Sequence, residues 1–267
     1  MAERVSCLGP EGSYTYLAAG NMCRGASLIP CVTFCSAVKA LLCGEADAAV
    51  LPIENTINGG VLQNLDLLAK HSELVAVHEY TLRIDHRLFT LEGADLKKID
   101  RIYSHRQALD QCADYLNRNY PSAQLIAENS TAAALSCIKL PTDGAIAGAQ
   151  CAREGLVASA ECISDEKNNF THFLLVKKGG LAPDFKSRKV FITLICNHVP
   201  GALVGILQRI YDFNLNMTKI ESRPLKDRVG EYRFFIEIEG DYSEKNVKDA
   251  LAALAAEASS FRVLGAY

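Results

Sequence analysis

The sequence contains no tryptophan, no C-x-x-C pair and no long apolar segment. Its 10 cysteines are scattered, and the closest pair, Cys31 and Cys35, lacks the clustered His or Cys partners typical of a zinc site. No run approaches the ~18 apolar residues that a membrane-spanning helix needs. The first residues, MAERVSCLGPEG, lack the apolar core of a signal peptide. We therefore expect a cytoplasmic protein with reduced thiols, most of them in the core, no metal and no membrane contact.

An excess of charge of either sign is also missing. The chain has 28 basic and 31 acidic residues, which gives a net charge of −3. This balance provides no electrostatic argument for nucleic-acid binding. The length of 267 residues and the 49% hydrophobic content predict a globular protein with one large or two smaller domains.

Strand-like and helix-like segments alternate along the first two thirds of the chain, which predicts an α/β domain with a mainly parallel sheet. Strands are expected in eight segments: 4–9, 27–32, 47–55, 75–91 (one long or two short strands), 99–105, 123–129, 143–148 and 168–178. Helices are expected over 16–22, 33–46, 61–71, 107–119, 130–140 and 149–156. Residues 179–189 form a glycine-containing linker, and the remaining segments follow a βαββαβ order typical of a ferredoxin-like unit.

Polar residues gather where predicted strands end and helices begin, at residues 12–15, 54–60, 104–107 and 129–131. Several helix N-termini around one crevice could hold a small dianion through free backbone N–H groups. Helix capping is the simpler explanation for each cluster alone. Residues 54–56 fit that explanation least, because a cap needs one polar residue rather than three. Gly59 and Gly60 would let the backbone approach the ligand.

The C-terminal unit has two candidate recognition segments, His198-Val199-Pro200-Gly201-Ala202-Leu203 and Glu221-Ser222-Arg223-Pro224. Backbone donors together with Glu221 and Arg223 could recognise the carboxylate and amine of an amino acid. A turn with a surface ion pair is the alternative.

Taken in order, these motifs resemble those of bacterial monofunctional prephenate dehydratases. The resemblance rests on GPEGSYT, on Pro52-Ile53-Glu54-Asn55-Thr56-Ile57-Asn58-Gly59, on residues 105–112 (HRQALDQC) and on residues 169–173 (NFTHF). The C-terminal unit resembles an ACT domain, with its "GAL" segment at 201–203 and its "ESRP" segment at 221–224. Two positions depart from the family pattern: Arg106 replaces a proline, and His172 replaces an arginine. Because alternate residues of a strand face opposite sides, His172 should point away from any cleft that Thr171 faces.

The resemblance implies a catalytic domain over 1–180 with two lobes, 1–78 plus 162–180 and 79–161, similar to a type II periplasmic-binding fold. An ACT regulatory domain would follow over 188–267. It implies conversion of prephenate to phenylpyruvate, water and CO2 without a cofactor, since aromatisation of the ring drives the reaction. Thr171 would assist departure of the ring hydroxyl. The implied substrate-binding residues are Ser13, Thr15, Asn55, Thr56, Ser104, Gln107, Ser130, Thr131 and Phe173. Glu54 would brace its loop by accepting backbone N–H bonds.

The resemblance also implies inhibition by L-phenylalanine and assembly as a homodimer or homotetramer. The implied effector site comprises Pro200, Gly201, Ala202, Leu203, Glu221, Ser222, Arg223 and Pro224. Three other functions stay open from the residues alone: a solute-binding or sensor module, an arogenate dehydratase, and a purely regulatory protein with a degenerate first domain.

Overall fold

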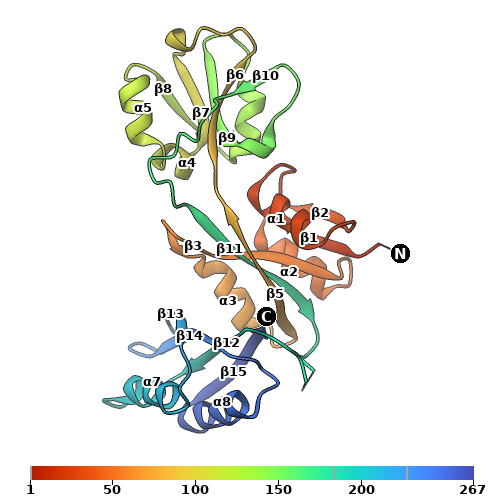
Figure 1. Cartoon of the computed structure of the whole chain (residues 1–267), viewed down its shortest axis with the longest axis vertical. Coiled ribbons are helices and arrows are strands. Elements are labelled where there is room, and N and C mark those ends of the chain that lie inside the picture. Colours follow the sequence, from red (N-terminus) through yellow and green to blue (C-terminus); the bar gives the residue numbers. More distant parts are fainter. Residues whose placement is uncertain (1, 183, 227) are drawn as a thin grey trace.

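The computed structural model describes residues 2–182, 184–226 and 228–267 and shows three bodies stacked along one long axis (Figure 1). The second lobe of the catalytic domain lies at one end, the first lobe in the middle and the C-terminal domain at the other end. The chain passes from the first lobe into the second after β5 and returns before β11. The predicted two-lobed α/β domain followed by a βαββαβ unit is confirmed.

The first lobe is built on a mixed sheet in the order β2-β1-β3-β11-β5. Strand β1 is parallel to β2 and β3, whereas β11 runs antiparallel to both β3 and β5. Its strands are β1 (Arg4–Leu8), β2 (Ser27–Cys31), β3 (Ala48–Asn55), β4 (Gly59–Gly60), β5 (Leu74–Arg83) and β11 (Phe170–Lys178). Its helices are α1 (Tyr14–Met22), α2 (Phe34–Leu42) and α3 (Leu62–Lys70).

The second lobe has a smaller mixed sheet in the order β10-β6-β9-β7-β8. Its strands are β6 (His86–Leu91), β7 (Arg101–His105), β8 (Gln124–Glu128), β9 (Asp143–Gly148) and β10 (Leu156–Ala158). Its helices are short: α4 (Arg106–Asp110), α5 (Ala113–Asn119), α6 (Thr131–Ala134) and the 3-10 turns Leu96–Lys98, Leu135–Cys137 and Ala149–Cys151.

Several sequence predictions need correction. The sheets are mixed rather than mainly parallel, because β11 returns to the first lobe between β3 and β5 in the opposite direction. Residues 149–156 do not form a helix but a single 3-10 turn that leads into β10. Strand β5 pairs with β11 as far as Arg83, so the predicted lobe boundary between residues 78 and 79 falls inside a strand.

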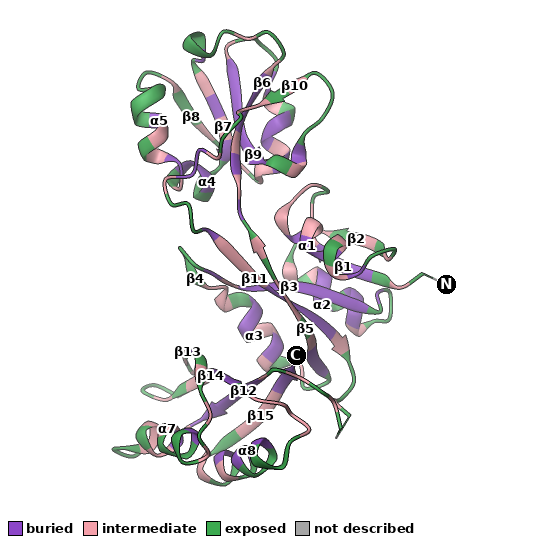
Figure 2. Ribbon diagram, in the orientation of Figure 1, coloured by how far each residue is buried: buried purple, intermediate pink, exposed green. Residues whose placement is uncertain are grey.

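The C-terminal domain has the predicted βαββαβ order: β12 (Lys189–Ile195), α7 (Ala202–Asp212), β13 (Met217–Pro224), β14 (Tyr232–Glu239), α8 (Lys245–Glu257) and β15 (Ser260–Ala266). Its strands lie in the order β13-β14-β12-β15. Alternate residues of β12 serve two cores. Ile192 and Leu194 pack with α7 and α8, whereas Phe191 packs with the first lobe. Figure 2 shows that α7 and α8 expose their outer faces.

The C-terminal domain is docked on the first lobe through side chains and through the backbone. Phe191, Phe235 and Tyr267 share one buried cluster with Leu65 and Leu68 of α3. Strand β15 also joins β5 by one parallel pair, Gly265 with Ala76, so the strands of the first lobe and of the C-terminal domain form one 10-stranded sheet. The sheet of the first lobe and the C-terminal domain are therefore joined through the backbone as well as through side chains.

The ten cysteines are free thiols, as predicted. The prediction that the thiols lie in the core is confirmed for Cys7, Cys23, Cys112 and Cys151. In contrast, Cys35 and Cys43 are exposed. Within the described parts of the chain, no helix is both long and apolar enough to cross a membrane.

The contact at Gly265 gives a stability prediction. A Cβ at this position would collide with the backbone of Ala76, lying 2.8 Å from its Cα atom. We expect Gly265→Ala to lower the free energy of unfolding by about 1–3 kcal/mol, the usual cost of overpacking. Gly180→Ala is the matched control, because a Cβ at Gly180 meets nothing within 4 Å. Denaturant unfolding of both variants checks this expectation, and equal stabilities would contradict it.

Candidate active site

A cavity of about 960 Å³ lies between the two lobes, where the carboxyl ends of their strands meet. Such an edge of an α/β sheet is a common ligand site. The cavity brings together most of the residues predicted to bind substrate: Ser13, Thr15, Asn55, Gln107, Ser130, Thr131, Thr171 and Phe173. It is also lined by residues that sequence reasoning did not select, chiefly Ile84, His86 and Gln111.

Two of the predicted substrate-binding residues lie elsewhere. The hydroxyl of Ser104 is fully buried and donates to the carbonyl oxygen of Ile146, in the middle of the second sheet. The hydroxyl of Thr56 donates to the carbonyl oxygen of Asn168 and accepts from the N–H of Phe170. Neither side chain lines the main cavity. Thr56 instead ties the turn after β3 to the start of β11.

Thr171 and Asn55 face each other across the β11–β3 pair, close to a bulge in that pair. The amide nitrogen of Asn55 lies 3.0 Å from Oγ1 of Thr171 and donates to it. The amide orientation is fixed because Oδ1 of Asn55 accepts from the N–H groups of Ile57 and Asn58. Since the Thr171 oxygen accepts from Asn55, its own hydrogen can point into the cavity.

Asn55 is connected to a buried chain of hydrogen bonds that crosses both lobes. Its amide also donates to Oδ1 of Asn169, which is fully buried, at 2.7 Å. Asn169 donates to Oε1 of Gln111, and the same oxygen lies 3.0 Å from Nε2 of His86. Nδ1 of His86 lies 3.3 Å from the hydroxyl of Tyr14. Because each member is held by the next, the Thr171 hydroxyl rests on a rigid polar support.

Asn58 links the two lobes directly. Its Oδ1 atom accepts hydrogen bonds of 2.7 Å from both Gln107 and Gln111. Asn58 belongs to the first lobe, whereas both glutamines belong to the α4 segment of the second. Gln107 is therefore engaged with Asn58 here, and this bridge holds the lobes at their present separation.

The cavity has little formal charge of its own. Among the described residues that line it, none is a lysine or arginine. Burial lowers the pKa of His86 and raises the pKa of Tyr14, so both side chains are neutral at neutral pH. An anion in this cavity has to be held by neutral donors and by backbone N–H groups.

Helix N-termini supply such donors from both lobes. The N-cap residues of α1, α4 and α6 are Ser13, His105 and Ser130, and all three line the cavity. Ser13 accepts from the N–H of Tyr16, and Ser130 accepts from the N–H of Ala133, so both hydroxyls act as caps. The capping explanation and the cleft explanation are thus compatible: the caps fix the helix ends, and the helix ends face the cavity.

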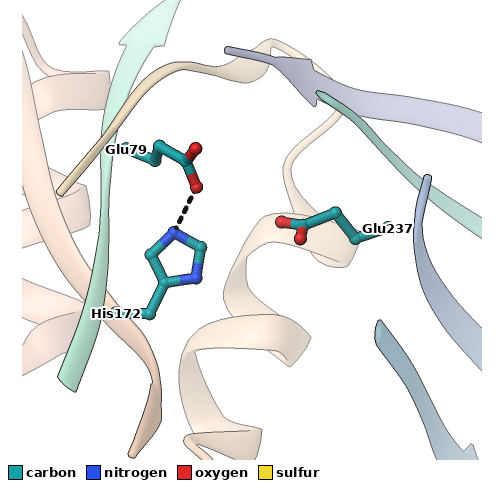
Figure 3. Close-up of side chains that lie close together, drawn as sticks. All are labelled: Glu79, His172 and Glu237. Atoms are coloured by element: carbon teal, nitrogen blue, oxygen red, sulfur yellow. Dashed lines mark ion pairs between the residues drawn. The ribbon is translucent and has the colours of Figure 1, made fainter. Parts of the chain in front are cut away.

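The opposite face of the same strand pair meets the C-terminal domain. His172 pairs with Glu54 across β11 and β3, one position on from Thr171 and Asn55. Figure 3 shows the His172 ring beside Glu79, with Nε2 lying 2.8 Å from Oε2 of that carboxylate. The ring N–H is poorly aligned with this oxygen, so the contact is electrostatic rather than a well-formed hydrogen bond. The polar contact with His172, followed by that with Lys189, lowers the pKa of Glu79 to about 2. His172 thus points away from the cavity, as expected.

Glu79, His172 and Glu237 place three possible metal ligands within 4.8 Å of one another (Figure 3). Nζ of Lys189 already lies 3.0 Å from Glu79 and 3.1 Å from Glu237. A lysine ammonium between both carboxylates supplies the positive charge that a metal would bring. We assign this cluster to domain docking.

The segment Glu54 to Gly60 differs from its prediction as a cleft wall. Asn55 alone among these residues lines the main cavity, while Ile57 and Asn58 line an adjoining cavity of about 540 Å³. Gly59 takes a φ of +75° in the turn, and a Cβ on Gly60 would lie 3.0 Å from Oε2 of Glu221. The glycine pair therefore serves the turn and the approach of the C-terminal domain, not the approach of a ligand.

Glu54 also differs from its prediction as a brace for the loop. Its carboxylate lies 2.9 Å from Nζ of Lys219, on strand β13.

The two segments predicted to bind an effector lie at the same end of the C-terminal sheet. Ile195, at the end of β12, pairs with Arg233, which in turn pairs with Arg223. The loop that follows Ile195 leads to Gly201, the N-cap of α7, which has a φ of +83° and no side chain to cover the helix end. Ser222 and Pro224 are exposed, whereas Arg223 is turned toward the first lobe and donates to both carboxylate oxygens of Asp66.

These features define a class: a two-lobed α/β protein with a polar cavity between its lobes and a docked βαββαβ domain. The prephenate dehydratase family model matches residues 5–180, and the ACT domain model matches residues 190–256. The chain therefore belongs to the prephenate dehydratase family. It is a hydro-lyase of phenylalanine biosynthesis, with an ACT domain for allosteric regulation.

Similar proteins span nearly all of the chain. It is 37% identical to the bifunctional chorismate mutase/prephenate dehydratase of Neisseria gonorrhoeae, covering 98% of this chain and 74% of that protein. It is 34% identical to the prephenate dehydratase of Amycolatopsis methanolica, covering 99% and 88%. The crystal structure of prephenate dehydratase from Arthrobacter aurescens in complex with L-Phe superposes with a TM-score of 0.88 at 33% identity, covering 99% and 90% of the two chains.

The position of Asn55 generates a prediction. Asn55→Ala removes the donor to Thr171 and leaves Asn169 without its partner, so kcat should fall by at least about tenfold and stability by about 1–3 kcal/mol. Asn64→Ala is the matched control, because Asn64 is also a buried asparagine of the first lobe but does not line the cavity, and its amide donates to the backbone carbonyl oxygen of Pro52 rather than to Thr171. It should lose stability with kcat unchanged. Steady-state kinetics and thermal melting of both variants separate the two effects, and equal kcat values would show that Asn55 does not position Thr171.

Proposed function

We propose that the cavity between the lobes converts prephenate to phenylpyruvate, water and CO2, with Thr171 as the catalytic residue. The observation that supports this most directly is the Thr171 hydroxyl, fixed by Asn55 at the cavity wall with its hydrogen available. In the reaction, the bond between the ring and its carboxylate breaks and releases CO2. The electron pair enters the ring, the C–O bond across the ring breaks, and the hydroxyl leaves with the electrons of that bond as hydroxide, which takes up a proton from the solvent to become water.

Thr171 assists this step by donating a hydrogen bond to the departing oxygen. A neutral hydroxyl has a high pKa, so hydrogen-bond donation as charge develops is easier than full proton transfer. Aromatisation of the ring supplies the driving force. The protein then needs only to orient the dianion and to stabilise the leaving oxygen.

The substrate carboxylates are held by the ends of α1, α4 and α6 and by neutral side chains around them. Thr15, Gln107 and Thr131 line the cavity at these ends, from both lobes. Phe173 is buried in the cavity wall and offers an apolar surface to the ring. Gln107 has to exchange its bond to Asn58 for one to the substrate, which couples binding to the separation of the lobes.

Arogenate is the alternative substrate, in which an amine replaces the side-chain ketone of prephenate. A carboxylate that contacts this amine would favour arogenate as the substrate. Glu11 is the carboxylate among the described residues that line the cavity, and it is exposed. We propose prephenate as the preferred substrate, and comparison of kcat/KM for the two compounds tests this preference.

We further propose that L-phenylalanine is the effector. The Arthrobacter aurescens relative was crystallised with L-Phe. In this chain the free N–H groups of the α7 end, at Gly201, can receive the ligand carboxylate. Leu203 can shelter the ring, and Ser222 and Pro224 lie exposed at the same end of the sheet. Glu221 and Arg223 face the first lobe instead, so they would link the effector site to the catalytic domain.

We propose that the protein acts in the cytoplasm as a homodimer or homotetramer. Strand β13 is the outer strand of the C-terminal sheet, and its exposed residue Ile220 lies on the same chain segment as Ser222. Pairing of two such edges would complete an effector site from two subunits. Light scattering of the purified protein measures the assembly.

The catalytic proposal predicts the behaviour of Thr171 variants. Thr171→Val keeps the shape of the side chain but removes the hydroxyl, so kcat should fall by about 10²–10³ with little change in substrate affinity. Thr171→Ser restores the hydroxyl and should recover most of the rate. Phenylpyruvate formation, followed by its absorbance in alkali, measures both. Near-normal turnover by Thr171→Val would remove Thr171 from the mechanism.

The effector proposal predicts that Gly201→Val abolishes the binding of phenylalanine and inhibition by it. The activity measured in the absence of phenylalanine should stay unchanged. The valine side chain would obstruct the end of α7 and would also strain a left-handed position. Gly44→Val is the control for strain, because Gly44 has a φ of +77° and equally open surroundings but lies in the catalytic domain. In calorimetry and inhibition assays with phenylalanine, Gly201→Val should differ from the wild type and Gly44→Val should not. Failure of the wild-type protein to bind phenylalanine would reject the proposal.

A further inference from the structure

The strand pair that carries Thr171 has two functional faces. Thr171 pairs with Asn55 on the cavity side, and the next pair, His172 with Glu54, faces the C-terminal domain. Because side chains alternate along strands, any residue that fixes Glu54 also acts on the residue next to the catalytic pair.

Lys219 of β13 is in a position to do this. Its ammonium group lies 2.9 Å from Oε2 of Glu54, and its side chain is only 5% exposed, compared with 40% for Glu54. An enclosed ammonium group depends strongly on its carboxylate partner, because water cannot replace that partner. The positions of Lys219 and Glu54 are therefore tied together.

The other side chains of β13 that face the first lobe contact different parts of it. Arg223 binds Asp66 on helix α3, and Glu221 lies against Gly60 in the turn after β3. Lys219, in contrast, contacts the residue that directly precedes Asn55. Strand β13 thus makes two ion pairs of similar chemistry with the first lobe. The pair of Lys219 involves the residue next to Asn55, whereas the pair of Arg223 involves helix α3.

We propose that Lys219 is a positioning residue for the Asn55–Thr171 pair, and that its contact with Glu54 transmits the position of the ACT domain to the cavity. This inference rests on the proposed function of the cavity and names the route of its regulation.

A small displacement is enough for this effect. Asn55 holds Oγ1 of Thr171 at 3.0 Å, so a shift of the Glu54 backbone moves the donor away from its acceptor. Misplacement of a catalytic group by about 1 Å can cost about 10²-fold in rate. An effector that binds one position of the ACT domain better than another then changes the population in which the catalytic pair is aligned.

The test compares four single variants and one double variant of the full-length protein. Lys219→Met removes the ammonium group, and the partly exposed Glu54 can take up water. Lys219→Arg keeps the charge, and Glu54→Gln removes the partner. Asp66→Asn is the matched control, because it breaks the other charged contact between β13 and the first lobe.

We expect Lys219→Met to lower kcat by about 10-fold to 100-fold with KM within about twofold, and to weaken inhibition by phenylalanine. Lys219→Arg should restore most of both properties, and Asp66→Asn should keep the kcat of the wild type. The Lys219→Met, Glu54→Gln double variant should lose no more than the worse single variant, because both act through one contact. Losses that multiply, or an unchanged kcat in Lys219→Met, would overturn the proposal.

Hydrogen exchange separates failure of this inference from failure of the proposed function. Lys219→Met should speed backbone amide exchange at residues 54–58, and Asp66→Asn should not. If the wild-type protein forms no phenylpyruvate, the proposed function is wrong, and the exchange result still decides whether Lys219 holds the strand. If exchange at these residues is unchanged, the inference fails even for an active enzyme.

Discussion

The alternation of side chains along β3 and β11 is the constraint on which the rest of the structure depends. One residue pair places Asn55 against Thr171 at the wall of the cavity, and the next pair places Glu54 and His172 against the C-terminal domain. A one-residue change of register would exchange these two sets and lose both sites together. The bulge after His172 sits where the two functions meet, a common position for bulges close to active sites.

Neutral side chains make up the hydrogen-bonded series at the cavity wall, and no lysine or arginine is among the described residues that line the cavity. The buried series from Thr171 through Asn55, Asn169 and Gln111 to His86 satisfies each amide group internally. Burial keeps His86 neutral by lowering its pKa, so it can join this series without adding a charge. Charge is concentrated on the other face, where Lys189 and Lys219 pair with Glu79, Glu237 and Glu54. Catalytic alignment and domain docking thus use different chemistry on opposite sides of one strand pair.

The replacement of the family arginine by His172 becomes understandable in this setting. His172 reaches Glu79, which also binds Lys189 of the C-terminal domain. The change therefore alters the docking surface and leaves Thr171 in place. The direction of the Thr171 side chain follows from strand geometry, which does not depend on the side chain at position 172.

The sequence by itself determined the βαββαβ domain, the cavity at strand ends and the opposite directions of Thr171 and His172, because these follow from local periodicity and from where the polar residues fall. The two-lobed plan was implied by the resemblance of the motifs to a known family. The sequence could not show that Ser104 and Thr56 serve the backbone, nor that Gln111 and His86 complete the polar support. Those roles depend on which strands become neighbours. Residues 54–60 show this most clearly: their many polar groups indicated a single ligand wall. The structure divides them among Thr171, the partner lobe and Lys219. Only tertiary structure could decide that division, since the contacts of Asn55, Asn58 and Glu54 lie more than 40 residues away along the chain.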